Sequence, residues 1–101
     1  MGERTGYVYL LHFVDADGRD AAYGHARHYL GFAVNLERRL AHHERGTGAN
    51  LLRHAAAAGL TWRLARVWCE QTRADERRRH NGGHRTRCPI CRPDMAQRLG
   101  L

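Results

Sequence analysis

Arg39 and His43 lie four residues apart in the segment LERRLAHH and therefore share one face of a predicted helix. A guanidinium suits a phosphate group because its planar fork donates two parallel charged hydrogen bonds. An imidazole beside it can donate to the same anion or transfer a proton near neutral pH. The pair therefore suits phosphate chemistry, although a solvent-exposed basic helix would show the same spacing.

The helix that presents this pair has recognisable ends. Asn35 is a predicted N-cap, because its side-chain oxygen can accept from the first unpaired backbone N–H groups. Leu36 and Leu40 share the face that we assign to the core. Gly46 is placed to end the helix, and an apolar strand end at residues 29–31 leads into the turn before it.

The rest of the chain predicts two further strands and two further helices. They are a strand at residues 6–14, a helix from Thr47 or Gly48 to Gly59, a strand at residues 61–69 and a charged helix at residues 73–80. The strand at residues 61–69 is apolar on both faces, with Trp62, Leu64 and Trp68 on one of them. This pattern predicts a central strand that is covered on each side. Residues 19–28 are predicted to be an insertion or a polar hairpin arm in solvent.

Composition predicts one basic domain over residues 1–101, with a core at about 6–80 and a tail at 81–101. The formal net charge is +7, and all 17 basic residues are arginine, which favours a polyanionic partner. No apolar run approaches the roughly 20 residues that span a membrane. The N-terminus lacks the pattern of a signal peptide, so we expect a soluble cytoplasmic protein without a membrane partner.

Two strand motifs and the helix between them resemble the GIY-YIG endonuclease family. Tyr7-Val8-Tyr9 stands where that family has its first motif, and Tyr29-Leu30-Gly31 where it has its second. Arg39 and His43 fall at the family's arginine and histidine positions, and Glu76 at its helical glutamate. The resemblance covers roughly residues 6–80. It implies an α+β fold in which a small three-stranded antiparallel sheet is flanked by helices.

The resemblance also implies a divalent-metal-dependent endonuclease that hydrolyses DNA phosphodiester bonds. Glu76 would be the ligand of Mg²⁺ or Mn²⁺, since hard cations take oxygen ligands. Tyr9 would deprotonate the attacking water, with Tyr29 orienting it, and a base role for Tyr9 would require a lowered pKa. Arg39 would stabilise the developing phosphorane charge, and His43 would contact the phosphate or assist proton movement. Glu70 is a rival metal ligand that lacks the helical setting.

Further positions are predicted to contact the substrate. Gly31 would leave room for its backbone, and Arg38, Arg53 and Arg79 are candidate phosphate contacts. A domain of this size offers little surface for reading a long sequence, so a homodimer or a protein partner is an open expectation.

The tail carries a second candidate site. His80, His84, Cys88 and Cys91 read H-x3-H-x3-C-x2-C, and the CxxC pair is a common zinc half-site. We expect a structural zinc here or a pair of reduced thiols, with Cys69 as a substitute ligand for a histidine. The alternative function is accordingly a non-catalytic, zinc-stabilised nucleic-acid-binding module. Retention of the two tyrosines together with Glu76 favours the nuclease, because a binding module does not need them.

Overall fold

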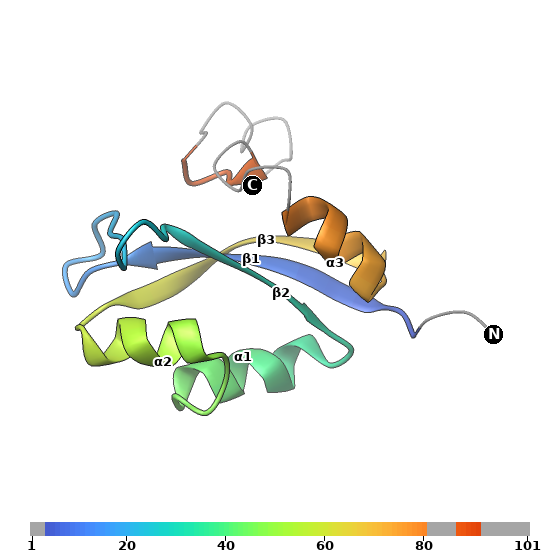
Figure 1. The fold of residues 1–101 in the computed structure, drawn as a ribbon, viewed down its shortest axis with the longest axis horizontal. Coiled ribbons are helices and arrows are strands. Elements are labelled where there is room, and N and C mark those ends of the chain that lie inside the picture. The colour runs from blue at the N-terminus through green and yellow to red at the C-terminus, as the bar shows by residue number, and fades with distance from the viewer. Residues whose placement is uncertain (1–3, 81–86, 92–101) are drawn as a thin grey trace.

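The computed structural model describes residues 4–80 and 87–91. It consists of one antiparallel sheet with helices on both of its faces, as Figure 1 shows. In chain order the elements are β1 (Gly6–Val14), β2 (His28–Ala33), α1 (Leu36–Glu44), α2 (Asn50–Ala57), β3 (Thr61–Gln71) and α3 (Arg73–His80). The predicted α+β class and three-stranded antiparallel sheet are confirmed. Within the described ranges, every helix is too short or too polar to cross a membrane.

The strand order is β2-β1-β3, so the first strand is the central one. Antiparallel pairing of β1 with β2 aligns Tyr9 with Gly31 and His12 with His28. Because successive strand residues point to opposite faces, this register sends Tyr9 to one face of the sheet and His12 to the other.

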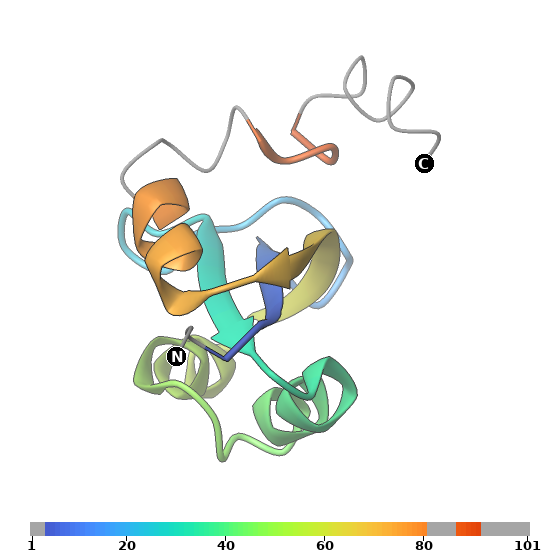
Figure 2. The same ribbon diagram turned by 90° about the vertical axis from the view of Figure 1, so that its right-hand side faces the viewer.

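Each face of the sheet carries its own core. The face covered by α1 and α2 holds Tyr9, Leu11 and Phe13 of β1 together with Leu52 and Ala55 of α2. The opposite face holds an aliphatic cluster to which the segment 87–91 contributes, and α3 lies over that same face. Figures 1 and 2 agree on this three-layer arrangement, in which the sheet separates α1 and α2 from α3 and residues 87–91.

The prediction that β3 is a central strand is wrong. The strand lies at the sheet edge, and Leu64 is 43% exposed. Its apolar residues are also distributed differently, since Trp62 packs on the α1–α2 face and Trp68 on the opposite face. An irregularity in the ladder explains this, because Leu10 aligns with Arg66 while Leu11 aligns with Leu64. A bulge of this kind reverses the alternation of side chains beyond it.

Of the predicted polar arm at residues 19–28, His28 is not in solvent but buried at the start of β2, and the remainder is a connection tied to the strand ends. Its backbone is held by the hydrogen bond from Phe13 N to Arg27 O at 3.0 Å and by a bridge between Val14 and Asp20. The aromatic ring of Tyr23 stacks against His54 of α2, with ring centroids 6.5 Å apart. The arm therefore contacts α2 through Tyr23 and returns the chain to the start of β2.

The predicted cap of α1 is confirmed, because the Asn35 side chain accepts from the backbone N–H of Arg38 at 3.0 Å. We expect Asn35→Ala to lower the free energy of unfolding by about 1 kcal/mol, the usual cost of losing such a cap. Urea denaturation would measure it. Asn50→Ala is the control, because Asn50 accepts only an exposed bond from Arg53. Equal losses in the two variants would contradict a capping role for Asn35.

Candidate active site and candidate metal centre

Three of the predicted catalytic side chains meet beneath the sheet. The Tyr9 hydroxyl and His43 Nε2 lie 2.7 Å apart and share a buried hydrogen bond. The Tyr29 ring is 6.2 Å from that of Tyr9 and 5.5 Å from that of His43, measured between centroids. Tyr9 is 0% exposed, whereas Tyr29 is only partly buried. Tyr29 is therefore the phenol that reaches the surface.

Two glycines leave the space that these rings occupy. A Cβ on Gly31 would collide with the Tyr9 hydroxyl, and one on Gly48 would collide with Nδ1 of His43. Gly31 was predicted to make room for a substrate backbone, but in the structure the nearest group is Tyr9. Among the described residues, His43 Nδ1 is a buried nitrogen without a hydrogen-bond partner, so Nε2 makes the contact that fixes this ring.

Burial controls the protonation of this group. Burial and the neighbouring Tyr29 raise the pKa of Tyr9, while the positive charge of Arg39 opposes that shift. Burial likewise raises the pKa of Tyr29 against the effect of Arg39. Burial, followed by Arg39 and His42, lowers the pKa of His43 to about 4. Both phenols are therefore protonated and His43 is neutral at neutral pH. The lowered tyrosine pKa that a base role requires is not supplied by Arg39 alone.

Glu76 belongs to α3, the helix on the face of the sheet opposite to α1 and α2. This helix contacts β2, and the negative charge of Glu76 contributes to the raised pKa of both Tyr9 and Tyr29. Throughout residues 4–80 and 87–91, the Glu76 carboxylate has no ion pair or hydrogen bond. The alternative that it pairs with Arg79 or His80 is therefore not observed.

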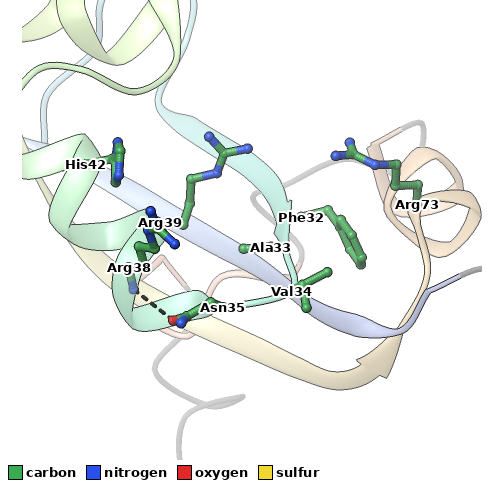
Figure 3. A pocket seen from close by; sticks show the side chains of 8 residues that line it. All are labelled: Phe32, Ala33, Val34, Asn35, Arg38, Arg39, His42 and Arg73. Carbon is green, nitrogen blue, oxygen red and sulfur yellow. Dashed lines mark hydrogen bonds between the residues drawn. The ribbon is translucent and has the colours of Figure 1, made fainter.

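An open groove of about 340 Å³ runs where the two layers meet at β2. Its polar lining comes from α1 and the start of α3, as Figure 3 shows, and comprises Asn35, Arg38, Arg39, His42 and Arg73. Arg38 and Arg39 are exposed and Arg73 faces them across the strand. The cationic side chains thus surround a surface suited to a phosphate group.

A second groove, of about 420 Å³, follows the beginning of the same strand. Tyr29 lines it together with His25 and Arg27 of the arm and His80 of α3. The two hollows lie along consecutive parts of β2, residues 32–33 and residues 28–30. The partly exposed phenol therefore lies in the second of two basic hollows along the edge strand.

Three sequence-predicted positions lie away from these grooves. Arg53 is exposed on α2 and donates to Asn50 at 3.3 Å. Arg79 lies with its guanidinium 4.5 Å from the centroid of the Trp68 ring, and burial and Arg87 lower its pKa. Glu70 is exposed at the end of β3 with a φ of 53°. Packing on an aromatic ring, rather than a groove position, thus accounts for the surroundings of Arg79.

The candidate metal centre differs from the predicted ligand set. One ligand atom from each of His12, His28, Cys88 and Cys91 lies within 4.8 Å of the others, so this group could hold a metal ion. The two cysteines were predicted, but the histidines that join them come from β1 and β2. His80 lines the second groove instead, and Cys69 is exposed on β3. His84 lies outside the described residues.

Sequence reasoning missed His12 and His28 because the cysteines were matched to the nearest histidines along the chain. The signal that could have found them is a histidine near each facing end of the first two strands, His12 before the turn and His28 after it. Their alignment depends on how the 13-residue connection between β1 and β2 closes, and spacing does not fix that register.

No protein-family model, curated protein or solved structure matches this chain. The resemblance to GIY-YIG endonucleases therefore stays a prediction.

The pKa of His43 predicts a pH-dependent stability. Between its ordinary value of 6.5 and about 4, the unfolded chain binds a proton at His43 that the folded chain does not. Stability from this group is thus complete above pH 6.5 and is lost as the pH falls towards 4. From about pH 7 to about pH 5, wild type should lose on the order of 2 kcal/mol more than His43→Gln, which keeps a hydrogen-bonding side chain.

Urea denaturation at the two pH values, with a chelator in all samples, would measure this difference. The other titratable groups are the same in both proteins, so the difference between wild type and His43→Gln gives the contribution of the His43 imidazole to the pH dependence of stability. Parallel losses in the two proteins would show that His43 is already protonated or solvated when folded.

Proposed function

We propose that this protein is a divalent-metal-dependent endonuclease that hydrolyses DNA phosphodiester bonds at the edge of β2. The observation that carries the proposal is the meeting of Tyr9, Tyr29 and His43 with the charges of Arg39 and Glu76. These five residues come from four elements, and a stable core does not need a buried tyrosine–histidine hydrogen bond.

The residues present fit Mg²⁺ or Mn²⁺ at Glu76. The carboxylate is partly buried, its charge raises the pKa of both phenols, and it makes no ion pair within the described part of the chain. When bound there, such a cation would neutralise phosphate charge, assist the leaving oxygen and lower the pKa of nearby water and phenols. A single protein carboxylate suffices where a phosphate supplies a further oxygen.

The exposures of the two tyrosines suggest a division of roles. As the partly exposed phenol, Tyr29 would orient the attacking water and, once deprotonated, accept its proton. Tyr9 is enclosed and holds Tyr29 in place while His43 holds Tyr9. This reverses the assignment taken from the family resemblance, in which Tyr9 is the base. Arg39, exposed beside both phenols, donates to the phosphate as negative charge develops on it.

The two grooves suggest the path of the nucleic acid. A phosphate backbone lying along β2 would pass Arg38, Arg39 and Arg73 at one end and Arg27 and His80 at the other. Contacts of this kind are independent of sequence and strengthen at low salt. The scissile phosphate would then lie over Tyr29.

The alternative is a basic module that binds nucleic acid without cutting it. The Cys/His cluster and the cationic groove favour this reading as well, since neither requires catalysis. The partly exposed Tyr29 favours the nuclease, together with a Glu76 carboxylate that has no ion pair within residues 4–80 and 87–91. The two readings differ in one measurable property, which is magnesium-dependent nicking.

We expect Glu76→Gln to abolish magnesium-dependent nicking while leaving DNA affinity within a few fold. The substitution removes the charge that binds the cation but keeps the size of the side chain. Labelled single-stranded, duplex and branched DNA, each with and without Mg²⁺, would report cleavage, and gel shifts would report binding. Glu70→Gln is the matched control and should cut like wild type. Undiminished cutting by Glu76→Gln would remove this residue from the site.

We expect Tyr29→Phe to reduce the single-turnover cleavage rate by about 10² or more, the usual contribution of a positioned proton acceptor. Tyr9→Phe should cost about tenfold, since Tyr9 acts through its neighbours. Binding should change little in either variant. A larger loss for Tyr9→Phe than for Tyr29→Phe would restore Tyr9 as the residue that contacts water.

A further inference from the structure

The spacings within the Cys/His cluster match those of a tetrahedral metal site. His12 Nδ1 lies 3.2 Å from His28 Nε2, 3.5 Å from Cys88 Sγ and 3.6 Å from Cys91 Sγ, and His28 Nε2 lies 3.4 Å from Cys91 Sγ. With ordinary zinc–ligand bond lengths, a tetrahedron has N···N edges of about 3.3 Å and N···S edges of about 3.6 Å. The four measured edges therefore fall within a few tenths of an ångström of these values.

Hydrogen bonding alone does not account for this convergence. The single Nδ1 atom of His12 has three partners, yet an imidazole nitrogen carries one lone pair or one proton. His12 is 2% exposed, His28 7% and Cys88 0%, so water does not supply the missing contacts. One cation between the four atoms would replace all of these partial contacts with ligand bonds.

We propose that His12, His28, Cys88 and Cys91 bind one zinc ion in a closed structural site. Two thiolates and two imidazoles favour zinc over Mg²⁺ or Mn²⁺, which prefer oxygen ligands. All four protein ligands come from this chain, so no position is left for water or a substrate, and the ion is structural rather than catalytic.

Asp20 completes the site by orienting one ligand. Its Oδ1 lies 2.8 Å from Nε2 of His12, on the side of the ring away from the cluster. Nε2–H donates to this carboxylate, which leaves the Nδ1 lone pair directed at the ion. Histidine ligands of metals are commonly held in this way. The arm between β1 and β2 thus has a role, since it supplies Asp20 and delivers His28.

The ion would fasten the end of the chain to the sheet. Cys88 and Cys91 are separated from His12 by 76 and 79 residues, so the site closes about three quarters of the sequence into a loop. His28 also directly precedes Tyr29, and consecutive strand residues point to opposite faces. Zinc bound to His28 on one face would therefore hold β2 in place, and with it Tyr29 on the other face. The functional importance of this effect rests on the proposed function.

The test is the metal content of protein purified under reducing conditions without added metal. We expect about one zinc per chain by elemental analysis, and less than a tenth of that in Cys91→Ser. Cys69→Ser is the matched control and should retain the ion, because Cys69 lies outside the cluster. Chelation should lower the melting temperature of wild type by about 10 °C and leave that of Cys91→Ser unchanged.

Further measurements do not depend on whether a ligand variant folds. Wild type reconstituted with Co²⁺ should show the intense visible bands of a tetrahedral site and thiolate-to-metal charge transfer in the near ultraviolet. Asp20→Asn should keep the ion with about 10- to 100-fold weaker affinity. His80→Ala and His84→Ala should retain full zinc content, whereas loss of zinc in these variants would restore the ligand set predicted from spacing.

Zinc-free wild type with reduced thiols, or a disulfide between Cys88 and Cys91, would overturn the proposal. These readouts are independent of cleavage. If the protein binds zinc but does not cut DNA, the proposed nuclease function is wrong and the zinc site stands. If the protein cuts DNA but contains no zinc, the zinc site is wrong and the nuclease function stands.

Discussion

The register between β1 and β2 is the constraint on which both candidate sites depend. The same ladder aligns Tyr9 with Gly31 and His12 with His28. A slip of β2 by one residue would exchange the faces of that strand, placing His28 under α1 and α2 and Tyr29 beneath residues 87–91. This alignment tolerates only glycine at position 31, because the space that a Cβ would take is filled by the Tyr9 hydroxyl. The pairing therefore places the tyrosine site and the Cys/His cluster on opposite faces of one sheet.

Burial of polar groups sets the properties of each site. Tyr9 and His43 are enclosed with a single hydrogen bond between them. Burial raises the pKa of Tyr9 and lowers that of His43, and both shifts favour the neutral side chain. On the other face, His12 and Cys88 are equally enclosed, but Nδ1 of His12 has three neighbouring ligand atoms around it. The first arrangement leaves Nδ1 of His43 without a partner among the described residues, whereas the second could hold a metal ion.

The edge position of β2 gathers part of the basic composition into one groove. Most arginines are exposed, and charge alone indicates no particular surface. At β2 the helix layers of both faces meet, so Arg38 and Arg39 of α1 lie across the strand from Arg73 of α3. Elsewhere, Arg66 and Arg79 pack against Trp68 and contribute to the structure of the domain.

The sequence by itself determined the elements and most of the candidate active site. Strand 6–14, the Asn35 cap and helix 73–80 follow from local periodicity and capping, which act between near neighbours. Motif order likewise joined Tyr9, Tyr29, Arg39, His43 and Glu76. Only the tertiary structure decided that β3 lies at the edge, that Tyr29 rather than Tyr9 reaches the surface, and that Cys88 and Cys91 meet His12 and His28. These depend on strand order, a bulge and a contact spanning 76 residues, none of which local spacing encodes.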